Sequence, residues 1–91
     1  MLRPVPSTRF KKNYQTMEKR GYDMSKIDEV IETLLEEKPL PAERLDHALT
    51  GNWNGYMECH VTPDWLLIYR IDGADLLLYL TRTGTHSDLF E

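Results

Sequence analysis

The chain has 91 residues, of which 41% are hydrophobic and 29% are charged. This length fits one compact domain, spanning residues 1–91, and excludes a two-domain enzyme. Eleven lysine and arginine residues against fifteen aspartate and glutamate residues give a net charge of −4, so the overall basic charge of a nonspecific nucleic-acid-binding protein is missing. A low net charge weakens such binding without excluding a small local site.

The sequence favours a cytoplasmic protein with no membrane partner. No apolar run approaches the roughly 20 residues of a membrane span, and the N-terminus lacks the apolar stretch of a secretory signal. The lone Cys59 cannot form an internal disulfide, which agrees with a reducing compartment.

The first segment is compatible with a strand at a sheet edge. If Leu2–Val5 is a strand, Pro4 and Pro6 confine it to an edge because proline cannot donate a ladder hydrogen bond. Ser7 or Thr8 can then cap a helix. The apolar stripe of this helix, at positions i, i+4 and i+7, consists of Phe10, Tyr14 and Met17.

A second helix has the clearest period in the chain. Gly21 ends the first helix, and Asp23 can cap the second. The short break predicts an antiparallel helical hairpin that closes at Pro39 and Pro41. Its apolar stripe consists of Ile27, Val30, Ile31, Leu34 and Leu35.

The second half of the chain predicts a loop and then a three-stranded meander. The loop over 39–52 has room for one helical turn near 43–45. Turns at 62–64 and 72–73 separate the β-like runs. These runs are Trp53–Val61, Trp65–Ile71 and Leu76–Thr81. The expected fold class is α+β, with two N-terminal antiparallel helices packed on a small, mainly antiparallel twisted sheet.

Three histidines are the first candidates for chemistry, because imidazole suits proton transfer near neutral pH. His47 precedes the first of the three strands, His60 ends it and His86 follows the last. We expect them to converge on one end or face of the sheet, with Asp64 and Arg82 as neighbours. Each histidine taken alone is more simply a structural or solvated residue.

These residue types fit phosphodiester cleavage better than acyl transfer. Attack by an RNA 2′-OH on the adjacent phosphorus needs a base, an acid and a cation, which histidine or aspartate and arginine can supply. No Gly-x-Ser-x-Gly elbow or glycine-rich phosphate loop is present. Cys59 points away from His60 on a strand, so it is interpreted as core. The three histidines and Asp64 include ligand types that zinc accepts, but their spacing is unspecific. We therefore expect no metal and no cofactor, with a three-histidine zinc site as the less favoured alternative.

Aromatic and basic residues offer contacts for RNA. Most aromatics are expected in the core, but Phe90, near the chain end, is free to stack on a base. A basic face lies opposite the apolar stripe of the first helix and is either a surface for ribosomal RNA or a solvated helix face. Its residues are Lys11, Lys12, Lys19 and Arg20.

The motifs in order resemble the YafQ-type toxins of the RelE superfamily. The resemblance is densest over residues 46–90 and rests on Asp46-His47, Gly51–Tyr56, His60–Tyr69, Arg82–His86 and Leu89-Phe90. It implies the toxin of a bacterial type II toxin-antitoxin module: a metal-independent endoribonuclease that cleaves mRNA in the ribosomal A site. It also implies a cognate antitoxin as partner, with operator DNA contacted only indirectly through that antitoxin.

The resemblance also implies roles for residues. His86 matches the general acid at the leaving 5′-oxygen, and Arg82 matches the residue that neutralises the scissile phosphate. Which residue is the general base stays open. The other matches are His60 and Asp64 for proton transfer or substrate orientation, His47 as a further catalytic histidine, Phe90 for positioning RNA, and Trp65 with a less direct role.

Two other functions stay open for this fold. One is a non-enzymatic inhibitor that poisons DNA gyrase by binding it, against which the intact histidine set argues. The other is a degenerate toxin kept as a regulatory partner of its antitoxin.

Overall fold

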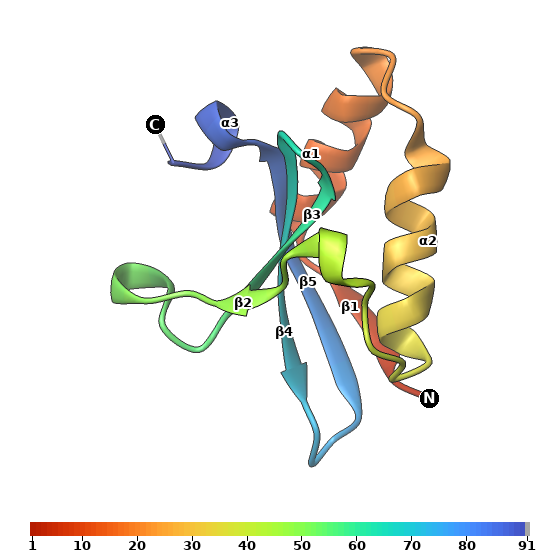
Figure 1. Cartoon of the computed structure of the whole chain (residues 1–91), viewed down its shortest axis with the longest axis vertical. Coiled ribbons are helices and arrows are strands. Elements are labelled where there is room, and N and C mark those ends of the chain that lie inside the picture. The colour runs from red at the N-terminus through yellow and green to blue at the C-terminus, as the bar shows by residue number, and fades with distance from the viewer. Residues whose placement is uncertain (91) are drawn as a thin grey trace.

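The computed structural model describes residues 1–90 and contains one mixed sheet with two helices on one face (Figure 1). The strands are β1 Arg3–Pro6, β2 His47–Ala48, β3 Met57–Thr62, β4 Trp65–Asp72 and β5 Leu77–Thr85. The helices are α1 Thr8–Lys19, α2 Met24–Leu35 and α3 His86–Phe90, with short 3-10 turns η1 Ala42–Arg44 and η2 Gly51–Trp53. The strand order is β1-β5-β4-β3-β2. Only β1 pairs in parallel, with β5, so the predicted α+β class, the mainly antiparallel sheet and the edge position of β1 are confirmed.

The two N-terminal helices begin at the predicted caps. The Ser7 hydroxyl accepts a hydrogen bond from the Phe10 amide at 2.9 Å. The Asp23 carboxylate accepts one from the Ser25 amide at 3.1 Å. Gly21, with φ of 87°, turns the chain between the helices, because glycine adopts this backbone conformation without strain. The helices then run side by side in opposite directions (Figure 1).

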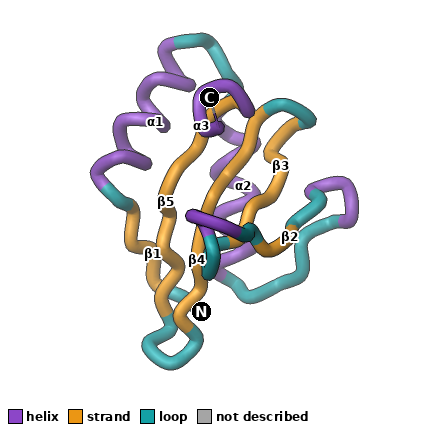
Figure 2. Tube along the Cα trace, turned by 90° about the vertical axis from the view of Figure 1, so that its left-hand side faces the viewer, coloured by secondary structure: helices purple, strands orange, loops and turns teal. Residues whose placement is uncertain are grey.

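The main core lies between these helices and the sheet. Cys59 is fully buried there, as predicted, and burial raises the pKa of its thiol to about 12. A smaller apolar cluster lies on the other face of the sheet, under α3 and the β2–β3 loop (Figure 2). It consists of Leu66, Ile68 and Leu89 with Leu49, Trp53 and Tyr56. This second face is therefore only partly covered.

Three predicted boundaries differ from the structure. His47 lies in the short strand β2 instead of a loop, because it pairs with Glu58 of β3. Trp53 lies in η2 and not in a strand. The last strand continues to Thr85, so Arg82 lies inside β5 and not at its end. A register shift sets Arg82 opposite Ile68 and lets pairing with β4 continue to the end of β5.

Within residues 1–90, no helix combines the length and the apolar character needed to cross a membrane.

Candidate active site

One row of paired residues crosses four strands on the face of the sheet that α1 and α2 do not cover. His47 pairs with Glu58, Glu58 with Ile68, and Ile68 with Arg82. Directly opposed residues share a face of a sheet, and Ile68 belongs to the smaller apolar cluster. His47, Glu58 and Arg82 therefore share the partly covered face.

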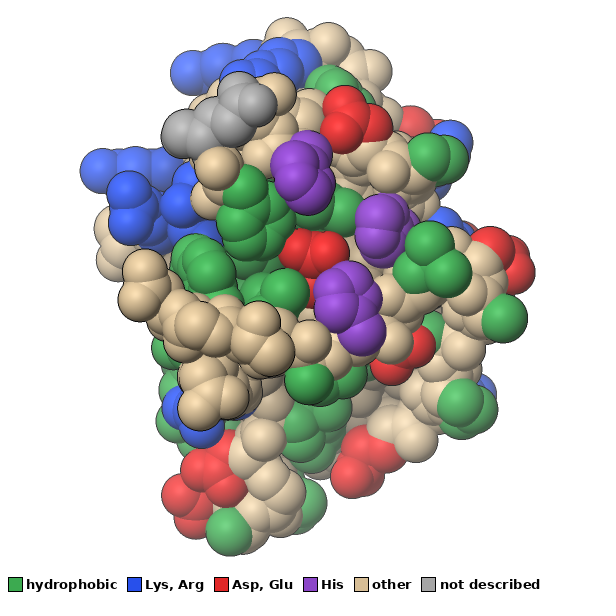
Figure 3. All heavy atoms as spheres, turned by 60° about the vertical axis from the view of Figure 1, so that its left-hand side comes forward, with side chains coloured by type: hydrophobic (Ala, Val, Ile, Leu, Met, Phe, Trp, Pro, Cys, Tyr) green, Lys and Arg blue, Asp and Glu red, His purple; other side chains and the backbone are tan. Residues whose placement is uncertain are grey.

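A second row brings His60 and His86 to the same region. His60 pairs with Leu66, which pairs with Gly84. His86 follows β5 directly and begins α3. The space-filling view shows all three histidines of the chain gathered on one face, with lysine and arginine side chains along one border (Figure 3). The expected convergence of the histidines is confirmed.

Two of the imidazoles are oriented by carbonyl oxygens. His47 Nδ1 lies 2.9 Å from the Leu45 oxygen, and His60 Nδ1 lies 3.3 Å from the Pro63 oxygen. A carbonyl oxygen only accepts hydrogen bonds, so each Nδ1 carries the proton of the contact. In both rings Nε2 is then the nitrogen that can take up or release a proton.

Glu58 is a site residue that the sequence analysis missed. It lies on β3 two residues before His60, so the two side chains share a face. Its side chain is 8% exposed, and Oε1 lies 3.5 Å from His47 Nε2. The spacing of two from His60 on a strand was the available signal. The pairing with His47 depends on the register of β2, which the sequence does not display.

Arg82 is held at its inner edge by α1. Its Nε donates to Asn13 Oδ1 at 2.8 Å, and the Thr83 amide donates to the same oxygen at 3.3 Å. Burial, together with the nearby positive charge of Arg9, lowers the pKa of the guanidinium. Since only Nε of Arg82 is bonded to Asn13, its two outer nitrogens can bind an anion, and the positive charge of Arg9 nearby favours this.

Asp64 was expected to lie beside Arg82, and it does not. It lies in the turn before β4, four residues from Ile68, the partner of Arg82. That separation is about 13 Å along the strand. Asp64 lies instead at the end of the sheet that carries His86, because Trp65 pairs with Thr85.

Phe90 and His86 pack against each other at the end of the chain. Their ring centroids lie 5.1 Å apart with an angle of 47° between the planes. Phe90 is 37% exposed, so one part of the ring faces solvent next to the histidine.

Trp65 is a core residue, so a direct substrate contact of its side chain is not supported. It is fully buried, its Nε1 donates to Thr83 Oγ1 at 2.9 Å, and Tyr22 packs against it edge-on. Thr83 Oγ1 donates in turn to the Leu66 carbonyl at 2.7 Å. These two buried hydrogen bonds join β4 to β5, so packing explains why a tryptophan stands at this position of the motif.

The four basic residues predicted on α1 and at its end, Lys11, Lys12, Lys19 and Arg20, are all exposed. Arg20 also forms an ion pair with Asp88 of α3 at 2.7 Å.

No cluster of three or more histidine, cysteine or acidic side chains within residues 1–90 has an arrangement that could hold a metal ion.

Comparison with known proteins relates this sequence and fold to bacterial toxins. The family described as the YafQ bacterial toxin of type II toxin-antitoxin systems matches residues 2–91. The mRNA interferase toxin YafQ of Escherichia coli K12 is 44% identical over 85 residues, which cover 92% of this chain and 90% of that protein. The crystal structure of the E. coli DinJ-YafQ complex matches with a TM-score of 0.91 and 40% identity, covering 100% of both chains. A copper-bound mutant toxin from Helicobacter pylori matches with a TM-score of 0.92 and 40% identity, covering 99% of this chain and 100% of that one.

These matches define the class as toxins of bacterial type II toxin-antitoxin systems. The chain belongs to the YafQ family of these toxins.

Proposed function

We propose that this chain is an endoribonuclease that cleaves mRNA in the ribosomal A site and is silenced by a cognate antitoxin. The observation that carries the proposal is the gathering of three histidines, a buried carboxylate and an arginine on one partly covered face of the sheet. The E. coli relative named an mRNA interferase supports the activity, and the DinJ-YafQ complex supports the antitoxin.

The proposed reaction is attack of a 2′-OH on the adjacent phosphorus. A base removes the 2′-OH proton, the P–O5′ bond breaks, and an acid protonates the leaving 5′-oxygen, so a 2′,3′-cyclic phosphate forms. His86 is the acid, and Phe90 packs against its ring and positions the RNA. Arg82 neutralises the charge that develops on the phosphoryl oxygens.

His60 and His47 are the candidates for the base. In each ring the carbonyl contact at Nδ1 leaves Nε2 for proton transfer. His47 Nε2 lies 3.5 Å from the Glu58 carboxylate, so this nitrogen already has a carboxylate neighbour. His60 Nε2 has no such carboxylate contact among the described residues, so it is the more accessible of the two nitrogens for the 2′-OH proton. Asp64, at the end of the sheet that carries His86, orients the substrate there.

The test is expression of the toxin without antitoxin, with mRNA 5′ ends mapped before and after induction and His86→Ala as the matched variant. Discrete new ends in translated frames that are absent with His86→Ala support the ribosome-dependent nuclease. Growth arrest with DNA damage signalling and unchanged mRNA would point to a gyrase poison. Expression without growth arrest would point to a degenerate toxin.

A second experiment tests metal independence. The proposed roles use side chains alone, whereas the H. pylori relative binds copper. We expect the same cleavage rate on programmed ribosomes after the toxin has been treated with a chelator and dialysed. A rate that falls after this treatment and returns with added copper would contradict the metal-independent reaction.

A further inference from the structure

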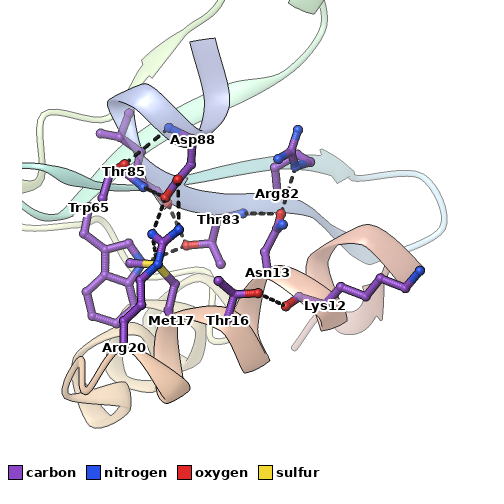
Figure 4. A network of polar contacts seen from close by, with 11 residues as sticks. Lys12, Asn13, Thr16, Met17, Arg20, Trp65, Arg82, Thr83, Thr85 and Asp88 are labelled. Atoms are coloured by element: carbon purple, nitrogen blue, oxygen red, sulfur yellow. Dashed lines mark hydrogen bonds and ion pairs between the residues drawn. The ribbon is translucent and has the colours of Figure 1, made fainter. Parts of the chain in front are cut away.

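A polar network ties α1 to Thr85 and Asp88 (Figure 4), which lie on either side of His86 in the chain. Arg20, the C-cap residue of α1, forms a bidentate ion pair with Asp88 of α3. Nη1 lies 2.7 Å from Oδ2 and Nη2 lies 3.2 Å from Oδ1. A two-point contact of this kind fixes the orientation of the carboxylate as well as its distance.

Asp88 in turn closes the short segment around His86. Its Oδ2 accepts a hydrogen bond from the Thr85 amide at 2.9 Å, and its own amide donates to Thr85 Oγ1 at 3.3 Å. These two bonds join the residue before His86 to the residue two positions after it. The Asp88 carboxylate therefore fixes the backbone before the imidazole, and the Thr85 hydroxyl fixes the backbone after it.

Gly84 makes this arrangement possible. A Cβ atom at Gly84 would lie 2.9 Å from Asp88 Cβ, closer than such atoms approach. Asp88 thus packs directly on the β5 backbone, and its ion pair with Arg20 of α1 holds it in that position.

We propose that Arg20 and Asp88 are positioning residues for His86 and Phe90, and that they hold the imidazole in its productive place. The inference rests on the proposed nuclease function. Neither residue touches the substrate. Their ion pair anchors α3, on which both functional rings lie, to the rigid helix–sheet core. This assigns Arg20 to the architecture of the site, whereas the sequence left it open between a surface for ribosomal RNA and a solvated helix face.

The variants are Arg20→Gln, Arg20→Lys, Asp88→Asn and the Arg20→Gln/Asp88→Asn double variant. Arg3→Gln is the control, since it removes an exposed positive charge from β1, which pairs with the end of β5 farthest from His86. Single-turnover cleavage of mRNA on programmed ribosomes, with toxin in excess, separates the maximal rate from the toxin concentration that gives half of it. Thermal unfolding gives the folded fraction at the assay temperature.

We expect Arg20→Gln and Asp88→Asn to lower the maximal rate by about 10- to 100-fold, because a displacement of about 1 Å has effects of that size. The half-saturating concentration should change by less than about threefold, since the RNA-contacting groups remain. Arg20→Lys should lie between these variants and the wild type, because it keeps the charge but loses the two-point contact. The double variant should be no slower than the slower single variant, because both changes break one interaction.

An NMR readout separates this inference from the proposed function. We expect the His86 imidazole C2–H signal to shift in Arg20→Gln and its nuclear Overhauser effect to the Phe90 ring to weaken. Both should be unchanged in Arg3→Gln. If the wild-type toxin does not cut RNA, the proposed function fails, and the NMR comparison still decides whether the pair positions His86. Wild-type cleavage per folded molecule together with unchanged His86 signals in Arg20→Gln or Arg20→Lys would overturn the positioning role.

Discussion

The ring of Phe90 packs on the imidazole of His86, with the centroids 5.1 Å apart and the planes tilted by 47°. Phe90 is 37% exposed, so it adds less to the core than a buried phenylalanine does. Phe90→Ala should therefore reduce mRNA cleavage strongly and lower the free energy of unfolding by only about 1 kcal/mol. Phe90→Tyr, which keeps the ring, is the control in ribosome cleavage assays and urea unfolding. Undiminished cleavage by Phe90→Ala would remove the functional role of this contact.

In His60, Nδ1 orients the ring through its contact with the Pro63 carbonyl, and Nε2 is left for proton transfer. A substitution can therefore keep the first function and remove the second. An asparagine at position 60 has an amide N–H near the place of Nδ1 and nothing in the place of Nε2. His60→Asn should therefore fold normally and lose about 100-fold or more in cleavage rate, the usual loss when a general acid or base is removed. Melting curves and single-turnover cleavage test this expectation. Wild-type cleavage by His60→Asn would leave His47 as the base.

Glu58 is the buried carboxylate of the site, and its position suggests electrostatic support for the histidines. Glu58→Gln keeps the side-chain volume and removes the charge. Because an ionised group is costly to bury, this variant should be as stable as the wild type to within about 1 kcal/mol. Its cleavage rate should nevertheless fall. A cycle with His47→Ala measures the coupling, and purely additive effects on the rate would show that the two residues act separately.

The helical part of the fold was predictable because local signals agree there. The cap at Ser7, the turn at Gly21 and the cap at Asp23 each act within a few residues, and the apolar stripes face one sheet. The extension of β5 to Thr85 was not predictable, because its residues lack the apolar alternation of a strand. They are held by pairing with β4 and by contacts to α1 and α3, which are distant in sequence.

The site shows the same division between local and long-range information. Residue type and position near turns identified the three histidines, since proton-transfer groups are recognisable in isolation. Glu58 was missed, and the ion pair of Arg20 was not predicted, because their partners, His47 and Asp88, are set by strand register and by helix packing. Trp65 stands at a position of the sequence motif. A motif alone does not show whether a side chain packs in the core or contacts the substrate.

Cys59 provides a probe of global unfolding. It is fully buried, and burial raises the pKa of its thiol to about 12. The folded-state pKa is above the unfolded value, so this group favours the folded state below about pH 8.5 and loses that contribution as pH rises toward 12. Iodoacetamide at pH 8 should label the native protein only at its rate of unfolding. Rapid labelling of fully folded protein would contradict the burial of this thiol.

The Arg20–Asp88 pair should make stability depend on pH in acid. The Arg20 guanidinium and the Thr85 hydrogen bonds hold the pKa of the Asp88 carboxyl well below its usual range. A lowered folded-state pKa stabilises the fold above the unfolded value, near pH 4, and the contribution is lost as the pH falls below it. The side chains of Arg20 and Asp88 are 43% and 30% exposed, so solvent screening keeps the contribution of the pair small.

Asp88→Asn should therefore be less stable than the wild type at pH 6–8, and the two unfolding curves should converge as the pH falls below about 4. Urea unfolding across this pH range measures the difference. Glu43→Gln, which removes an exposed carboxylate on η1, is the matched control and should track the wild type throughout. Because exposed charges are screened by salt, 1 M NaCl should shrink the difference at neutral pH. A stability gap that persists unchanged at pH 2 would mean that Asp88 acts through packing on Gly84 and not through its charge.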